Sequence, residues 1–233
     1  MDFPFKSPHC PDPFSCGSEP RDTIMTQRNS YLRYENSALP QVAGDQGNFT
    51  AALVALGANL PKDGKPPEVT LRHALASLPN QRVQIQAVSR FFRSPAYPAG
   101  SGPDYVNAVA LLHVRICANE LLAHLHTIEA QIGRTRMSRW GARVVDLDLL
   151  SHGSAVLPDA LTESAWREMS VADQVRATPG QLILPHPRIA DRAFVLVPLA
   201  EVAPGWVHPA TGQGARAMLA ALPEADKAAL RPL

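Results

Sequence analysis

The alternation of hydrophobic and polar residues predicts strands from residue 48 onward. The apolar run TAALVALGAN (50–59) ends in a glycine and an asparagine, which is typical of a buried strand that enters a turn. Apolar and polar residues alternate in RVQIQAVSR (82–90), and a longer alternation follows in DYVNAVALLHVRI (104–116). In this longer segment every second residue from Val106 onward is apolar and shares one face, so Asn107 points to the other face.

Apolar side chains three or four residues apart predict helices. Aliphatic residues recur at this spacing in 71–78 and in 121–132, where Gly133 follows as a C-terminal cap. Residues 184–204 predict a proline-fixed turn and an apolar helix, and residues 214–223 a last short helix. With the Asp-bearing strand described below, the order is strand, helix, strand, strand, helix, strand. This order predicts an α+β fold that is ferredoxin-like, with helices packed on one side of a largely antiparallel sheet.

The chain is expected to contain one domain and a long extension. Residues 1–47 are rich in Pro, Ser, Asn, Asp and Gly and show no hydrophobic period, so we expect them to be disordered. Residues 48–233 form the predicted domain, in which SPAYPAGSGPD (94–104) is a long connection of the kind that often carries function. Residues 158–183 include a stretch with helical character and no recognisable motif, and we expect a surface insertion there.

Composition narrows the classes of function. The 233 residues carry a formal net charge of +1, whereas general nucleic-acid and membrane-surface binders carry a large excess of Lys and Arg. The three cysteines, Cys10, Cys16 and Cys117, predict neither a disulfide framework nor a zinc site and fit a reducing compartment. The sequence shows no signal-peptide pattern and no apolar run that could cross a bilayer. We therefore expect a cytoplasmic protein that binds neither nucleic acid nor a membrane.

The stretch GRTRMSRWGARVVDLDLL (133–150) combines four arginines with two aspartates. Residues two apart on a strand face the same way, about 6.5 to 7 Å apart along the backbone. Asp146 and Asp148 are therefore expected to project together, while the aliphatic residues beside them enter the core. Two adjacent carboxylates raise each other's pKa unless a cation lies between them. Oxygen ligands without a matching His or Cys favour Mg²⁺ over Zn²⁺, and Mg²⁺ usually completes its shell with water and substrate phosphates.

The arginines supply the complementary charge. Guanidinium groups bind phosphates bidentately, and four of them so close together are expected to meet an anion. Trp140, which lies among them, could cover a ligand or shield phosphates from water. Either motif alone is more often a solvated surface, whereas the two joined by a turn and backed by an apolar strand indicate a metal and phosphate site.

The same residues carry a resemblance to a known family. RWGARVVDLDLL (139–150) is similar to the signature of the 6-hydroxymethyl-7,8-dihydropterin pyrophosphokinases, enzymes of the folate pathway. Further segments follow in that family's order between about residues 52 and 222: LGANL, the SP of the long connection, PDYVNA, IEAQIGR, LPHPR and RAFVLVPLAEVAP. The resemblance implies transfer of pyrophosphate from ATP to the hydroxymethyl group of 6-hydroxymethyl-7,8-dihydropterin, with release of AMP.

The resemblance also implies roles for individual residues. Asp146 and Asp148 would hold two Mg²⁺ ions between the ATP phosphates and the pterin hydroxymethyl oxygen, and Arg134 and Arg143 would contact phosphates near the reacting centre. The implied ATP-binding residues are Glu129, Arg136, Arg139, Trp140, His186 and Arg192. The implied pterin-binding residues are Ser94, Pro95, Tyr105, Asn107 and Phe194, with the ring stacked between the two aromatic side chains.

Three departures from the family pattern concern adenine binding rather than the metal site. Ala142 stands where proline is more usual, Pro187 follows His186 where some members have an aromatic residue, and the insertion before LPHPR is longer.

Two other functions fit parts of the sequence. An RNA-binding module on a ferredoxin-like sheet would place the arginines on phosphates, but it also needs aromatic residues on the sheet for base stacking. The run VVDLDLL carries carboxylates instead. A regulatory nucleotide sensor without turnover would not need both aspartates together with the pterin-side residues. We therefore expect a monomeric, single-function enzyme that acts on two small molecules.

Overall fold

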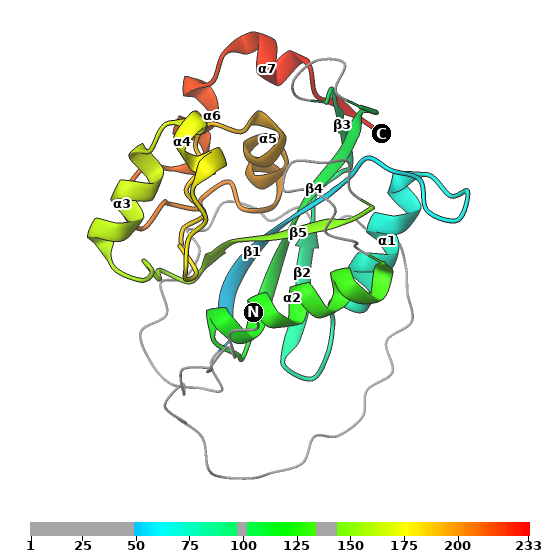
Figure 1. Ribbon diagram of the computed structural model, residues 1–233, viewed down its shortest axis with the longest axis horizontal. Coiled ribbons are helices and arrows are strands. Elements are labelled where there is room, and N and C mark those ends of the chain that lie inside the picture. Colours follow the sequence, from blue (N-terminus) through cyan, green and yellow to red (C-terminus); the bar gives the residue numbers. More distant parts are fainter. Residues whose placement is uncertain (1–48, 97–101, 134–143) are drawn as a thin grey trace. The chain divides into compact units, whose positions relative to one another are not determined.

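The computed structural model describes residues 49–96, 102–133 and 144–233 of the chain (Figure 1). The predicted extension 1–47 therefore lies outside the described residues. Within the described ranges, no helix is both long enough and apolar enough to span a membrane.

The core of the fold is an antiparallel sheet. Its strands are β1 (Thr50–Ala58), β2 (Val83–Val88), β3 (Phe92–Ser94), β4 (Tyr105–Val114), β5 (Asp146–His152) and β6 (Arg231–Pro232). They run in the order β5-β1-β4-β3-β6, and β2 pairs with β4 next to β3. All these pairs are antiparallel. The four predicted strands correspond to β1, β2, β4 and β5, and the ferredoxin-like α+β prediction is confirmed. The short strands β3 and β6 were not predicted.

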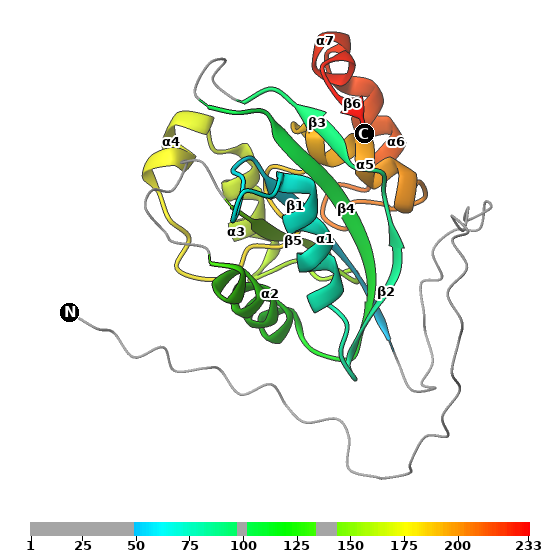
Figure 2. The same ribbon diagram turned by 90° about the vertical axis from the view of Figure 1, so that its right-hand side faces the viewer.

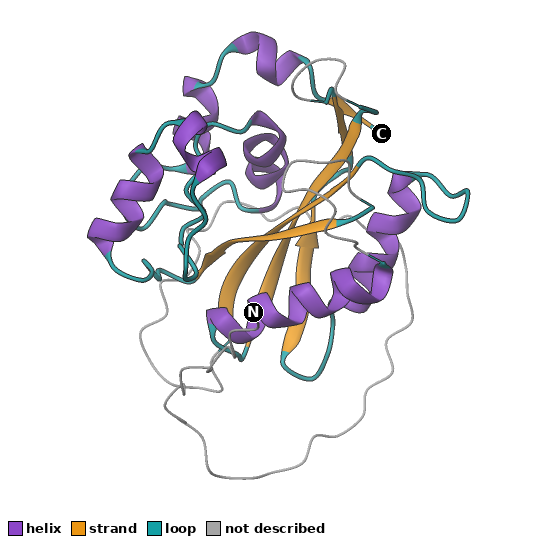
Figure 3. Cartoon of the chain, viewed as in Figure 1, coloured by secondary structure: helices purple, strands orange, loops and turns teal. Residues whose placement is uncertain are grey.

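Helices cover both faces of this sheet (Figures 2 and 3). They are α1 (Pro67–Ser77), α2 (Ala118–Ile132), α3 (Ala160–Glu168), α4 (Val171–Arg176), α5 (Ala193–Val202), α6 (Ala215–Ala221) and α7 (Glu224–Ala228). Helices α1 and α2 pack on one face, over a core that includes Leu56, Leu112 and Leu147. Helix α5 packs against β4 on the other face, over Val109 and Leu111. The expectation of helices on one side only is therefore wrong, because β4 carries apolar residues on both faces and each face needs a cover.

The ends of α1 and α2 follow local sequence signals. Helix α1 begins with Pro67, whose missing N–H costs nothing at the first helical position. At the start of α2 the Glu120 carboxylate accepts a hydrogen bond from the Cys117 backbone N–H at 3.0 Å. The predicted cap at the other end is present, since Gly133 adopts the left-handed conformation with φ 98°.

The stretch predicted as an insertion folds into α3 and α4. Their N-caps are Asp159 and Ser170, whose side-chain oxygens accept hydrogen bonds from backbone N–H groups in the first turn. Glu163 of α3 is fully buried and accepts a hydrogen bond from the Arg167 guanidinium at 3.2 Å. The helical character of this stretch is thus confirmed, and its being an insertion stays a prediction.

Candidate active site

Strand β5 places two carboxylates on one face of the sheet. Asp146 lies opposite Gly57 of β1, and Asp148 lies opposite Ala55. Both aspartates are partly exposed, whereas Leu147 between them is buried under α2. The expectation that the two carboxylates project together is confirmed. Further along the same face, Leu150 packs in the core beneath α5, so the site begins where the α5-covered core ends.

A row of directly paired residues runs across the sheet from the first aspartate. Asp146 pairs with Gly57, Gly57 pairs with Asn107, and Asn107 pairs with Phe92. Paired residues of antiparallel strands share a face, so all four lie on the aspartate side. Gly57 contributes no side chain to this row, and a Cβ built there would lie 3.6 Å from Asn107 Oδ1. We call this position without a side chain, between the carboxylate of β5 and the amide of β4, the opening at Gly57.

The predicted pterin residues of β3 and β4 lie together on this face. Asn107 is 5 % exposed, and its Nδ2 donates a hydrogen bond to Ser94 Oγ at 2.9 Å. Tyr105 pairs directly with Ser94 and is partly exposed, and Pro95 is exposed next to it. The Ser94 bond fixes the orientation of the Asn107 amide. Its Oδ1 is then the atom nearest the opening at Gly57.

The N-terminal end of α5 brings a cation to the aspartates. Arg192 is the N-cap residue of α5, and its guanidinium carbon lies 5.6 Å from the centroid of the Phe194 ring. Burial lowers the pKa of the Arg192 guanidinium, while the negative charges of Asp148 and Asp146 oppose that shift. Arg192 therefore interacts electrostatically with both carboxylates, and a guanidinium stays protonated in proteins. Phe194 is 38 % exposed, so a flat ligand can reach its ring.

His186 is held as a neutral hydrogen-bond donor. Its Nδ1 accepts a hydrogen bond from the Arg188 backbone N–H at 3.1 Å, which leaves the proton on Nε2. Burial, followed by the positive charge of Arg192, lowers the pKa of His186 to about 3. The imidazole thus presents an N–H without bringing a positive charge of its own.

Glu129 was predicted to bind ATP, and the structure gives it a further contact. It is 2 % exposed, and its Oε1 accepts a hydrogen bond from the Leu147 backbone N–H at 2.7 Å. Leu147 lies between the two aspartates, so this bond ties α2 to the centre of the candidate site. The predicted contact with the nucleotide stays a prediction.

Sequence reasoning missed two residues near the site. Arg188 belongs to the LPHPR segment but was assigned no role; its positive charge lowers the pKa of both His186 and Arg192, and it pairs with Asp191 at 2.6 Å. Asn59 of LGANL is 3 % exposed, and its Nδ2 donates to the Pro103 carbonyl at 3.3 Å. The sequence offered two signals for them. Arg188 lies four residues before Arg192, and the polar Asn59 directly follows the first predicted strand.

The arginine-rich half of the predicted site lies outside the described residues. This concerns Arg134, Arg136, Arg139, Trp140, Ala142 and Arg143. In the described part of the chain, no group of three or more His, Cys, Asp or Glu side chains is arranged to hold a metal ion.

Comparison with known proteins identifies similar chains. The family model described as 7,8-dihydro-6-hydroxymethylpterin-pyrophosphokinase (HPPK) matches residues 53–204. The 2-amino-4-hydroxy-6-hydroxymethyldihydropteridine pyrophosphokinase of Synechocystis sp. is 36 % identical over 163 residues, which cover 70 % of this chain and 71 % of the relative. The protein of the same description from Pseudomonas aeruginosa is 35 % identical over 170 residues, covering 73 % and 90 %.

Solved structures show the same fold. The HPPK-DHPS protein of Plasmodium falciparum, crystallised with pteroate, superposes with a TM-score of 0.53 at 10 % identity over 74 % of this chain. The matched part is 44 % of the Plasmodium chain, so this chain spans less than half the length of that protein.

Proposed function

Because the chain belongs to the 7,8-dihydro-6-hydroxymethylpterin-pyrophosphokinase family, we propose that it transfers pyrophosphate from ATP to 6-hydroxymethyl-7,8-dihydropterin in folate biosynthesis. In this reaction the hydroxymethyl oxygen loses its proton and forms a bond to the β-phosphorus of ATP. The bond from the β-phosphorus to the bridging oxygen of the α-phosphate breaks, and AMP leaves with that oxygen. The enzyme is thus an ATP-dependent diphosphotransferase.

One observation supports the proposal: the row Asp146, Gly57 and Asn107 joins an anionic edge of the sheet to an amide that can recognise a heterocycle. The reaction requires a pterin hydroxymethyl group and ATP phosphates to meet. The opening at Gly57 lies between the two kinds of side chain. Positioning of two reactants in this way lowers the barrier without a dedicated base.

On the pterin side, Asn107 and the two aromatic residues do the binding. The Asn107 amide, oriented by Ser94, reads the hydrogen-bonding edge of the pterin. Tyr105 and Phe194 come from β4 and α5, which pack on each other, and they offer ring faces to the flat substrate. Pro95, exposed beside Ser94, borders the same space.

On the phosphate side, the donor set fits Mg²⁺. Asp146 and Asp148 offer hard oxygen ligands, and we propose that they hold two Mg²⁺ ions, which neutralise the phosphates and polarise the β-phosphorus when bound. Arg192 adds a fixed positive charge, and the His186 Nε2–H donates a hydrogen bond to a phosphate oxygen. Among the arginines outside the described residues, Arg134 and Arg143 would also contact phosphates near the reacting centre.

The test is release of AMP from ATP, measured with and without the pterin and Mg²⁺. We expect AMP only when both are present. Gly57→Leu should abolish release while the protein stays folded, because the side chain fills the opening, whereas Gly57→Ala should keep much of the activity, since its Cβ meets Asn107 Oδ1 at an ordinary contact distance of 3.6 Å. A folded Gly57→Leu variant with parental turnover would refute this placement of the substrates.

We also propose that the protein acts as a monomer in the cytoplasm and takes no nucleic acid or membrane as partner. The reaction needs only two small, water-soluble substrates. Sedimentation with and without ATP tests the oligomeric state.

A further inference from the structure

Two asparagine amides hold the two ends of the connection between β3 and β4. At its start, Asn107 Nδ2 donates a hydrogen bond to Ser94 Oγ at 2.9 Å. At its other end, just before β4, Asn59 Nδ2 donates to the Pro103 carbonyl at 3.3 Å. Asn107 is already part of the proposed pterin contacts, whereas Asn59 is not.

The register of the sheet brings Asn59 to the candidate site. Strand β1 ends at Ala58, which pairs with Val106 of β4. Asn59 follows directly, so continuing the strand by one residue brings it level with Tyr105, the first residue of β4. Side chains two residues apart along a strand share a face. Asn59 therefore lies on the same side of the sheet as Gly57 and the opening there.

The Asn59 amide is enclosed against the connection. Its side chain is 3 % exposed, and a buried amide normally has hydrogen-bond partners. A Cβ built on Gly102 would lie 3.7 Å from Asn59 Nδ2, so the amide contacts two consecutive residues, Gly102 and Pro103. Proline has no N–H, so the carbonyl is the only backbone hydrogen-bonding group of Pro103. The bond to Asn59 thus fixes the chain two residues before Tyr105.

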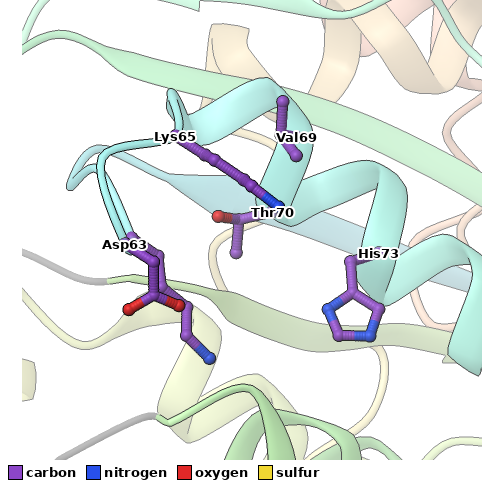
Figure 4. A pocket seen from close by; sticks show the side chains of 6 residues that line it. Asp63, Lys65, Val69, Thr70 and His73 are labelled. Atoms are coloured by element: carbon purple, nitrogen blue, oxygen red, sulfur yellow. The ribbon is translucent and has the colours of Figure 1, made fainter.

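The segment that carries Asn59 is itself held in place. Lys62 and Lys65 pair through two backbone hydrogen bonds of 3.0 and 2.8 Å. The Lys62 ammonium donates to the Ile132 carbonyl at the C-terminal end of α2. Figure 4 shows this turn next to α1, with a pocket of about 300 Å³ between them. Because the turn is tied to α2, Asn59 can hold the connection rather than follow it.

We propose that Asn59 is a positioning residue for the pterin, and that its bond to Pro103 keeps the Tyr105 ring in place for stacking. The proposal rests on the proposed function and deepens it. Loss of the bond releases the end of the connection that leads into Tyr105, while the bond between Asn107 and Ser94 still holds its start. The affinity for the pterin should therefore fall. The affinity for ATP should persist, because its proposed ligands lie on other elements.

The experiment measures AMP release by the full chain as a function of each substrate in turn. Asn59→Leu has a similar size and removes the donor. Its KM for the pterin should rise about two- to tenfold, as expected for one neutral hydrogen bond. Its KM for ATP and its kcat should stay close to those of the parent. Asn59→Asp keeps the size and places an oxygen against the Pro103 carbonyl, so its KM for the pterin should rise as well; this variant decides if Asn59→Leu does not fold.

Gly102→Ala is the matched control within the same connection. Its added Cβ would meet the Asn59 amide at an ordinary contact distance of 3.7 Å and leaves the bond to Pro103 intact, so both KM values should equal those of the parent. An unchanged KM for the pterin in the folded Asn59 variants would overturn the proposal. Equal increases in both KM values would also overturn it, because they would indicate a general structural effect. A parent that released no AMP would instead refute the proposed function, and with it this role of Asn59.

Discussion

The bond between Glu129 and the Leu147 backbone is expected to hold β5 in place. Glu129→Ala removes the acceptor and leaves a buried N–H, since Leu147 is 2 % exposed. A hydrogen bond to a charged group contributes about 1.5 to 3 kcal/mol. A domain of this size changes its melting temperature by roughly 2 to 4 °C per kcal/mol. We therefore expect Glu129→Ala to melt about 3 to 12 °C below the parent.

Two further variants make this result specific. Glu129→Gln keeps an oxygen acceptor, so its loss of stability should be smaller, about 1 kcal/mol. Glu224→Ala is the control, because the side chain of Glu224 is 85 % exposed and such substitutions change stability by at most about 0.5 kcal/mol.

The assay combines thermal unfolding with AMP release. Because Leu147 separates the two aspartates, turnover should fall in the order parent, Gln variant, Ala variant, at temperatures where all three are folded. If Glu129→Ala melted together with the Glu224→Ala control, the bond would contribute nothing and the reasoning would be refuted.

Three other predictions follow from the site and the fold. Asp148→Asn, which keeps the size of the side chain, should lower turnover by orders of magnitude while folding persists, because metal stabilisation worth several kcal/mol is lost. Turnover equal to that of the parent in both this variant and Asp146→Asn would refute the proposed metal site. The lowered pKa of His186, about 3, means that the unfolded chain takes up a proton near pH 6.5 that the folded chain resists. The free energy of unfolding should therefore decrease as the pH falls from about 6.5 toward 3, and less steeply in His186→Gln; identical slopes in urea unfolding would contradict this. Deletion of residues 1–47 should leave the melting temperature and turnover nearly unchanged, whereas a large loss of either would show that these residues contribute to the domain.

Much of the fold could be predicted because its signals are local. Each signal needs only a few neighbouring residues: the alternation around Asn107 and the apolar neighbours of Asp146 predict strands, and Gly133 predicts the end of a helix. Strand β3 has three residues and β6 has two, too few to show a period. The second covered face of the sheet was visible as Val109 and Leu111, but a nearly continuous apolar strand does not say which helix will cover it.

The site was predictable only as far as side-chain types define it. Two aspartates two residues apart on a strand predict a shared face. The partner of Glu129, in contrast, is a backbone N–H, and because every residue except proline has one, this hydrogen bond cannot be predicted from the sequence. The opening at Gly57 could likewise not be predicted from residue types. A glycine after an apolar run is typical of a turn, yet here it lies inside β1, and its importance comes from the register that places it between Asp146 and Asn107. Register is a property of strands far apart in sequence, so the alignment of Asp146, Gly57 and Asn107 in one row became visible only in three dimensions.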